Sequence, residues 1–463
     1  MPSPRVQLPP TAHDWDALRA ELGVPEAFPP EVEAEARGAV PRLPSTDLTD
    51  LPFLTIDPPG SVDLDQAMAL ERRGTGYRVR YAIADVAAFV VPGGAVDREA
   101  HRRGFTLYAP DRRTPLHPPV LSEGAASLLA GQDRPAVVWD LTLDADGELV
   151  ETRVERALVR SRRQLDYETV QRDLDAGTAT PDLLLLREIG VLRHARARER
   201  DAVDLRTPEQ LVGPDGELSF RAPLPVEEWN AQISLLTGMA AAALMLEGRV
   251  GLLRTLPDPD PRDVASLRRS ALALGVAWAA DETYGDVLSA LDPARPEAAA
   301  VLNLATRLLR GAGYTAFDGA LPELTTHSGV AAPYAHVTAP LRRLADRYAA
   351  EVCLALCAGT AVPDWVRAAL PVVPEEMAAA DQRARALDRA VVDLAEACLL
   401  QHRVGEVFRA VVVDANGKGG TVQLLHPAVR ARLDGADAPL GETVDVVLES
   451  VDVPGRSVRF RLG

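Results

Sequence analysis

The chain has 463 residues, of which 47% are hydrophobic and 25% are charged, and its formal net charge at pH 7 is −17. This composition fits a soluble globular protein, and the length predicts two to four domains. The sequence shows no apolar run as long as a membrane span and no N-terminal signal-peptide core, and its three cysteines are too few for a disulfide framework. We therefore expect a cytoplasmic protein without a membrane partner.

The net charge argues against a nucleic-acid partner, because phosphate groups bind cations, but it says little about any single groove. The positive charge is almost all arginine, since Lys418 is the only lysine. Arginine can bind phosphate through two parallel hydrogen bonds, so this bias suits phosphate recognition. A coding bias towards arginine and alanine explains most of the count, and only the placement of individual arginines is informative.

Residues 1–45 are rich in proline and contain two short helical patterns. Asp14 can cap a helix over WDALRAEL, in which Trp15, Leu18 and Leu22 share one face. A second helix is predicted over EVEAEARGAV. We expect a small helical N-terminal domain, and its few basic residues argue against DNA reading.

Residues 46–160 predict an α/β arrangement, with strands over YRVRYAIADV and VVWDLTLDAD and a helix from Asp97 to Arg103 between them. Residues 161–403 are expected to be mostly helical, because they contain long amphipathic runs such as RALDRAVVDLAEACLL. Residues 404–463 contain five short strand patterns separated by turns. Such a pattern predicts a small closed barrel of the OB type.

Three aspartates, Asp57, Asp63 and Asp65, fall within nine residues of TIDPPGSVDLDQAM, directly after the apolar run LPFLTI. The run predicts the end of a buried strand, and Pro-Pro-Gly predicts a turn after it. An extended backbone would point Asp63 and Asp65 to one side, and the turn would return Asp57 towards them. Crowded carboxylates are costly to bury unless a cation neutralises them, so the cluster predicts a Mg²⁺ or Mn²⁺ site. An acidic surface turn is the alternative, and the apolar flanks argue against it.

A second charged group lies in YAHVTAPLRRLADRY. Thr338 and Pro340 are typical of a helix start, so Arg342 and Arg343 are expected in the first helical turn. Cations there oppose the helix dipole, whereas an anion bound at the helix start would reverse the effect. Asp346 could pair with one arginine, but a single carboxylate does not account for both. The motif therefore predicts an anion site, which together with a carboxylate-bound metal suits phosphodiester hydrolysis.

Together with YAIADVAAFVVPGGAVDREAHRRGFTLYAPDRRTPLHPPVLSEGAASL, these motifs closely resemble the RNase II/RNB family of exoribonucleases in order and spacing. The resemblance covers residues 46–403 as a mixed α/β catalytic domain with a large helical part. Residues 404–463 resemble the S-one-type OB-fold RNA-binding domain that usually follows it. The resemblance implies a multidomain α+β protein that degrades single-stranded RNA processively from the 3′ end to nucleoside 5′-monophosphates by hydrolysis. It also implies Mg²⁺, with Mn²⁺ as a substitute, and we expect a monomer that does not act on DNA.

Carried over by position, Asp57, Asp63 and Asp65 match three of the four active-site aspartates of the family. Gln66 occupies the fourth position, where its oxygen could ligate a metal but brings no charge. Arg342 resembles the arginine that stabilises the scissile phosphate.

Tyr108 resembles the aromatic residue of the family that stacks on the 3′-terminal base. The further RNA contacts implied by the resemblance are Tyr167, Glu228, His336, Thr338 and Arg343. Ordinary half-buried packing is the alternative for the two tyrosines, and a solvated helix start is the alternative for Glu228.

Two departures from the family leave alternatives open. Because Gln66 lacks a charge, a catalytically weak RNA-binding member of the family is the rival function. Residues 1–45 are too few for the cold-shock OB domains that bacterial members usually carry, so the N-terminal piece has another role or the path to the site is more open. A DxD-type glycosyltransferase fits the acidic motif alone, but the sequence near Asp63 lacks a nucleotide-sugar-binding βαβ pattern.

Overall fold

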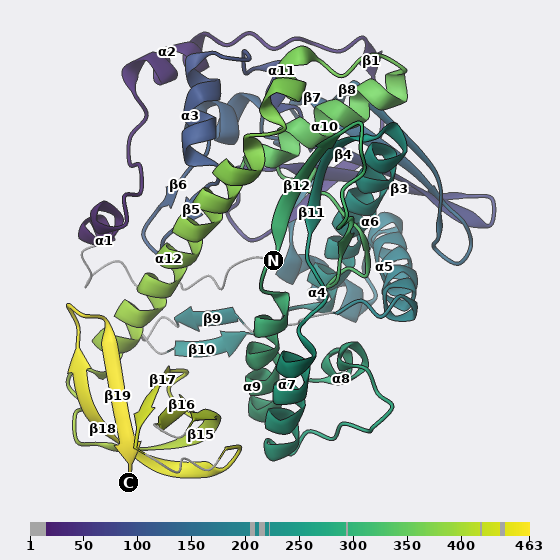
Figure 1. Ribbon diagram of the computed structural model, residues 1–463. Helices are drawn as coiled ribbons and strands as arrows, with labels where there is room; N and C mark the ends of the chain where they lie inside the picture. The colour runs from purple at the N-terminus through teal and green to yellow at the C-terminus, as the bar shows by residue number, and fades with distance from the viewer. Residues whose placement is uncertain are drawn as a thin grey trace.

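The computed structural model describes residues 15–203, 209–212, 218–221, 223–292, 295–416, 419–435 and 440–463. A mixed sheet with strand order β1-β8-β2-β3-β4-β7 forms the centre of the first part of the chain (Figure 1). The long strand β8 pairs antiparallel with β7 and, further along, parallel with β2, so the sheet closes on itself. Its strands are β1 (Thr46–Asp47), β2 (Phe53–Asp57), β3 (Gln66–Arg73), β4 (Gly76–Ala84), β7 (Asp133–Leu143) and β8 (Leu149–Asp166).

Strand β4 shows why this sequence forms a two-faced sheet. Alternate side chains of a strand point to opposite faces. Tyr77, Val79 and Tyr81 are buried in the largest apolar core. Arg78 and Arg80 lie on the other face, where both are close to Asp140 of β7. The strand predicted over YRVRYAIADV is therefore confirmed.

Helices cover the core face of this sheet. The helices α5 (Pro181–Glu199), α6 (Pro225–Gly248) and α10 (Leu344–Ala358) supply most of the helical side of the largest core. The predicted helix near Asp97 is confirmed as α3 (Ala95–Arg103). The remaining elements of this part are η1 (Val86–Ala88), β5 (Leu107–Tyr108), β6 (Arg113–Thr114), η2 (Leu121–Ala125), α4 (Tyr167–Ala176), β9 (Glu209–Val212), β10 (Leu218–Arg221), β11 (Val250–Thr255), α7 (Pro261–Ala273), α8 (Tyr284–Ala290), α9 (Pro296–Ala305), η3 (Thr306–Leu309), β12 (Gly313–Asp318), β13 (Thr326–His327), β14 (Ala332–Pro333) and α11 (Asp364–Ala369).

Helix α6 is long and apolar enough, by length and composition alone, to cross a membrane, and half of its most apolar window is buried inside the fold. The expectation that no apolar run reaches that length is therefore wrong. The helix packs against α5, α10 and β11, and its buried residues include Ile233, Leu236 and Met245. These contacts are those of a core helix.

The two N-terminal helices are confirmed as α1 (Trp15–Glu21) and α2 (Pro30–Gly38), while Asp14 lies outside the described residues. Both helices join cores that they share with later parts of the chain. Trp15 packs in the cluster of Leu387, and Val32 packs in the cluster of Phe53.

Helix α1 is also tied to two distant segments by hydrogen bonds. The buried Arg19 donates to both carboxylate oxygens of Asp111 (2.7 and 2.8 Å), in the turn between β5 and β6. Glu21 accepts two hydrogen bonds from Arg456 in the C-terminal barrel (2.7 and 2.8 Å).

The C-terminal strands form a closed barrel with order β15-β16-β17-β19-β18, which confirms the predicted small five-stranded barrel. Helix α12 (Val373–Leu400) leads into it from the first part of the chain (Figure 1). Ala397 and Leu400 of this helix pack in the barrel core with Phe408 and Phe460. The barrel strands are β15 (Val407–Asn416), β16 (Gly419–Leu424), β17 (Arg430–Asp434), β18 (Thr443–Asp452) and β19 (Ser457–Leu462).

Candidate active site

The loop between β2 and β3 carries the three aspartates. Asp57 is the last residue of β2, and the chain then turns as predicted. The Ser61 N–H donates to the Pro58 carbonyl (3.2 Å), and Gly60 has a φ of +78°, a conformation that glycine adopts without strain. Residues 61–65 belong to no helix or strand.

Asp63 faces the β5–β6 hairpin. Arg113 donates from Nη1 to Oδ1 of Asp63 (2.6 Å), and the Tyr108 hydroxyl donates to Oδ2 (3.4 Å). Arg113 also pairs with Glu123 (2.9 Å). Asp63 and Asp65 have different hydrogen-bond partners. The presentation of both carboxylates to one side of the chain stays a prediction.

Asp65 is 4% exposed and faces the segment that precedes α10. Its Oδ1 accepts a hydrogen bond from the Leu341 N–H (2.7 Å), and its Oδ2 lies 3.4 Å from Nε of Arg342. Burial raises the pKa of Asp65 well above its ordinary value; Arg342 offsets part of the rise and Asp63 adds to it. Further positive charge beside this carboxylate would stabilise its ionised form.

The donor chemistry of this loop fits a divalent cation, because carboxylates are hard oxygen ligands and Asp65 is incompletely neutralised. Within the described residues, however, no group of three or more His, Cys, Asp or Glu side chains is arranged as a metal site. Asp57, Asp63 and Asp65 thus supply suitable atoms, and ligation by all three requires their side chains to reorient.

Arg342 and Arg343 precede α10, which begins at Leu344, so their predicted place in its first turn is wrong. The guanidinium of Arg343 donates twice to Asp346 (2.5 and 2.7 Å). Arg342 has a side chain that is 43% exposed and lies beside Asp65. Asp346 therefore holds one arginine and leaves the other at the acidic loop.

Thr338 and His336 are turned into the protein. Thr338 is 4% exposed and its hydroxyl is hydrogen-bonded to that of Ser234 (2.8 Å), so it does not cap α10 as predicted. His336 shares a hydrogen bond between Nδ1 and the Tyr314 hydroxyl (2.7 Å). Burial, together with the nearby Arg343, lowers the pKa of His336 well below its ordinary value. RNA contacts by these side chains stay predictions.

Gln66, the first residue of β3, connects the sheet to this same segment. Its Oε1 accepts a hydrogen bond from the Tyr81 hydroxyl (2.5 Å), and its Nε2 donates to the Thr338 carbonyl (2.7 Å). Tyr81 is fully buried on the core face of β4, and burial is the main reason why its pKa lies well above the ordinary value.

Two polar residues of α6 were missed by the sequence analysis. Asn230 donates from Nδ2 to the Tyr167 hydroxyl (3.1 Å), and Ser234, one turn later, bonds to Thr338. Residues four apart share a helix face, so both reach the site. The signal for them was a pair of polar residues four positions apart, which share one face of a largely apolar helix.

Tyr167 and Glu228, two of the predicted RNA contacts, lie in different surroundings. Tyr167 begins α4, and its pKa is raised by burial and by the nearby Asp57. Glu228 lies 3.8 Å from His194 of α5. Tyr167 is therefore at the aspartate loop, whereas Glu228 faces a neighbouring helix, and the RNA contacts of both stay predictions.

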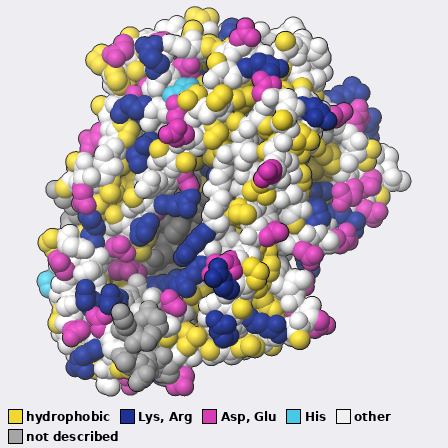
Figure 2. Space-filling view, viewed as in Figure 1, with side chains coloured by type: hydrophobic (Ala, Val, Ile, Leu, Met, Phe, Trp, Pro, Cys, Tyr) yellow, Lys and Arg dark blue, Asp and Glu magenta, His cyan; other side chains and the backbone are white. Residues whose placement is uncertain are grey.

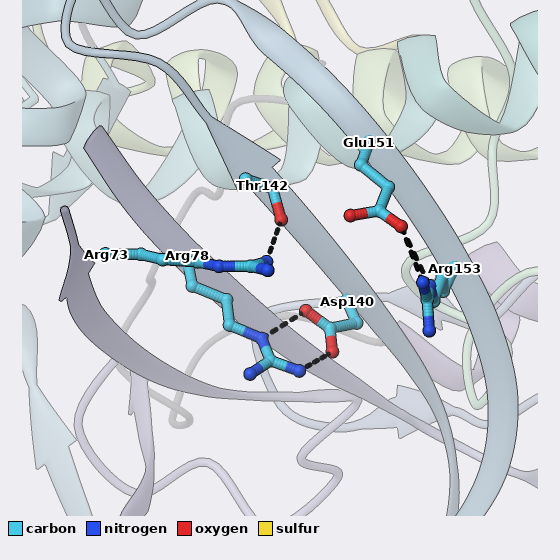
Figure 3. Close-up of a pocket in the computed structure, with 6 residues that line it drawn as sticks. All are labelled: Arg73, Arg78, Asp140, Thr142, Glu151 and Arg153. Atoms are coloured by element: carbon cyan, nitrogen blue, oxygen red, sulfur yellow. Dashed lines mark hydrogen bonds and ion pairs between the residues drawn. The ribbon is translucent and has the colours of Figure 1, made fainter. Parts of the chain in front are cut away.

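A small surface pocket lies on the face of the central sheet opposite Tyr81 (Figure 3). Arg78 pairs there with Asp140. Arg153 pairs with Glu151 (2.8 Å), and Arg73 donates to Thr142 (2.9 Å). These mutual pairs fit a structural charge network rather than a catalytic site. The lining residues are Arg73, Arg78, Asp140, Thr142, Glu151 and Arg153.

Positive charge is concentrated locally even though the net charge is −17. Figure 2 shows arginine side chains gathered near the centre of the face in view, above the C-terminal barrel. A surface patch with one sign of charge attracts ligands of the opposite sign. The surface therefore does not exclude a polyanionic ligand.

The family model of the RNB domain matches residues 45–357, more than half of the chain. The chain belongs to the RNB family. A second family model, that of the RNase II-type exonuclease C-terminal S1 domain, matches residues 406–463, which form the barrel. The family expected from the sequence motifs is thus confirmed.

Curated relatives extend this result. Ribonuclease R of Escherichia coli (strain K12) is 28% identical over 500 residues, which cover 95% of this chain and 60% of that protein. Exosome complex exonuclease RRP44 of Homo sapiens is 30% identical over 321 residues, which cover 65% of this chain and 33% of that protein. The chain therefore spans 60% or less of the length of these relatives.

Solved structures support the fold. Mycoplasma genitalium RNase R, in complex with ribose methylated single-stranded RNA, matches with a TM-score of 0.85 at 19% identity, over 97% of this chain and 77% of that chain. Yeast Ssd1, described as a pseudonuclease, matches with a TM-score of 0.70 at 17% identity, over 89% of this chain and 55% of that chain. A similar fold thus occurs both in an RNase R and in a protein described as a pseudonuclease.

Proposed function

We propose that this protein hydrolyses single-stranded RNA from the 3′ end and releases nucleoside 5′-monophosphates, with Mg²⁺ as its divalent cation. Membership of the RNB family supports the reaction class, and one observation carries the proposal. The half-exposed guanidinium of Arg342 lies beside the buried Asp65, at the end of the loop that also holds Asp57 and Asp63. Carboxylates can hold a divalent cation, and that cation together with an exposed arginine is suited to stabilise charge on a phosphate under attack.

Each residue of this group has a defined part. Asp57, Asp63 and Asp65 would hold the cation, which when bound neutralises phosphate charge and activates water. Arg342 offers a planar fork of N–H donors to the phosphate oxygens. Tyr108, whose hydroxyl reaches Asp63, offers its ring for stacking on the 3′-terminal base.

Direction and product are tested together with one oligoribonucleotide labelled at either end. With Mg²⁺ present, a 5′ label should give a descending ladder, and a 3′ label should appear at once as a mononucleotide. RNA that stays intact with both Mg²⁺ and Mn²⁺ refutes the proposal. Shortened RNAs of several nucleotides that retain the 3′ label refute the direction.

The second candidate is an RNA-binding member of the family with weak catalysis. It is favoured by the uncharged Gln66 and by the lack of a three-carboxylate metal arrangement among the described residues. Tight binding of the oligoribonucleotide without mononucleotide release would select it.

A monomeric, cytoplasmic protein is a further part of the proposal, and light scattering of purified protein tests the monomer.

A further inference from the structure

Gln66 stands where the family resemblance places a fourth carboxylate, and both ends of its amide are bonded within the protein. The oxygen accepts from the Tyr81 hydroxyl (2.5 Å), and the nitrogen donates to the Thr338 carbonyl (2.7 Å), a residue 272 positions away in the chain. A main-chain carbonyl can only accept a hydrogen bond. The nitrogen must therefore face Thr338, which fixes the orientation of the amide.

The segment that Gln66 reaches is short, irregular and directly followed by Arg342. The Arg342 N–H closes a turn onto the Ala339 carbonyl (3.2 Å). Three side chains hold this segment through hydrogen bonds. The Ser234 and Thr338 hydroxyls bond to each other (2.8 Å). The Ala339 N–H donates to Asp346 (2.7 Å), and the Leu341 N–H donates to Asp65 (2.7 Å). The direction in which Arg342 leaves the backbone is thus set by these side-chain contacts together with the main-chain hydrogen bond that the Thr106 N–H donates to the Arg342 carbonyl (3.0 Å).

A carboxylate at position 66 could not make the same contacts. It could accept from Tyr81, but it has no N–H to donate to the Thr338 carbonyl. An ionised group there would place a negative oxygen against that carbonyl and would add to the repulsion that Asp65 already experiences from Asp63. The amide therefore meets a requirement of this segment that aspartate or glutamate does not meet.

We propose that Gln66 is a positioning residue that holds Thr338, and through it directs Arg342 towards the phosphate, and that it is not a ligand of the cation. The inference rests on the proposed nuclease function for the identity of the group that Arg342 meets. Position 66 then supplies a hydrogen-bond donor where the family resemblance leads one to expect a negative charge.

Two substitutions separate a positioning residue from a ligand. Gln66→Met keeps the length of the side chain and removes both hydrogen bonds, and Gln66→Glu keeps the acceptor for Tyr81 but loses the donor to Thr338. Both variants should lower kcat about tenfold or more at saturating Mg²⁺, because a misplaced group costs rate. The KM for single-stranded RNA should change less than about threefold, since the stacking residues are untouched. Mn²⁺ affinity without RNA, measured by electron paramagnetic resonance, should be unchanged in Gln66→Met.

The opposite results overturn the inference. A ligand role predicts weaker Mn²⁺ binding in Gln66→Met with kcat restored at high metal concentration, and tighter Mn²⁺ binding with full kcat in Gln66→Glu. Gln132→Met, a change of an exposed glutamine in the turn before β7, serves as the matched control and should behave as the wild type.

Hydrogen exchange gives a measurement that does not depend on nuclease activity. In both Gln66 variants the backbone amides of Thr338, Ala339, Leu341 and Arg342 should exchange faster than in the wild type, whereas Gln132→Met should leave them unchanged. If wild-type protein releases no mononucleotide, the proposed function fails, and faster exchange in this segment still supports the bracing role of Gln66. Unchanged exchange overturns that role whatever the activity.

Discussion

Replacement of Asp65 by asparagine separates the charge of this side chain from its shape. Asparagine retains an Oδ1 that can accept the Leu341 N–H (2.7 Å in the wild type) and has nearly the same volume. The substitution removes the negative charge beside Arg342. It also removes the cost of burying that charge, which is the main reason why the pKa of Asp65 is raised.

The expected magnitudes depend on these contacts. A hydrogen bond to a charged acceptor contributes about 1.5–3 kcal/mol and one to a neutral acceptor about 1 kcal/mol, so the Leu341 bond weakens by roughly 1 kcal/mol. The ion pair adds little, because Arg342 is 43% exposed and such pairs contribute about 0–1 kcal/mol. Relief of charge burial offsets these losses, so the free energy of unfolding should stay within about 1 kcal/mol of wild type. The kcat should fall by a factor of about 100–1,000 or more, as for the loss of a main electrostatic group.

The assay combines mononucleotide release at saturating RNA and Mg²⁺, RNA binding by fluorescence anisotropy, and urea unfolding followed by circular dichroism. Asp140→Asn is the matched control, because Asp140 pairs with Arg78 on the opposite face of the sheet and should leave kcat unchanged. An Asp65→Asn protein that retains more than about a tenth of wild-type kcat would refute the reasoning. A large loss of stability together with a loss of RNA binding would also refute it, because Asp65 would then be needed for the folded structure rather than for the reaction.

Three further changes test other parts of the structure. Arg342→Lys keeps the charge but loses the planar fork, so kcat should fall at least about tenfold while the RNA Kd changes less than about threefold; an unchanged kcat would contradict this. His117 is 2% exposed, and burial lowers its pKa from the ordinary 6.5 to about 3. Its stabilising contribution is therefore present above pH 6.5 and is lost as the pH falls towards 3, at about 1.4 kcal/mol per pH unit. When the pH falls from about 6 to about 4, the free energy of unfolding should decrease by roughly 2–3 kcal/mol less in His117→Leu than in the wild type. Equal decreases in the two proteins would contradict this role of His117. Arg19→Met removes both hydrogen bonds to Asp111 and should loosen the hairpin that carries Tyr108, which a several-fold rise in RNA Kd and a lower Tm would show; no change in either would speak against this link.

The sequence predicted those elements whose folding depends on local pattern. The alternation in β4, the two N-terminal helices and the short strands of the barrel each depend on side chains close to one another in the chain. The turn at Pro58 and Gly60 likewise comes from residue types that restrict the backbone.

The errors lie where distant contacts decide the outcome. Thr338 has the residue type of a helix cap, but its hydroxyl is bonded to Ser234, which is 104 positions away. The strand pattern around Asp63 did not show that this carboxylate binds Arg113 of the next hairpin, which is 50 positions away. The sequence showed that Gln66 is uncharged, but not that its nitrogen faces a carbonyl 272 residues later. These partners depend on the assembled fold, which periodicity does not encode.

Helix α12 contributes to three cores along a single axis. Val373 packs with the central sheet, Leu387 with α1 and Leu400 with the barrel. Each added residue lengthens a helix by about 1.5 Å and rotates the rest of the chain about its axis by roughly 100°, because a turn takes about 3.6 residues. An insertion of one residue would therefore swing the barrel around the helix and break the contact between Glu21 and Arg456. An added length near one whole turn, about 5.4 Å, would instead return the barrel to the same side of the helix.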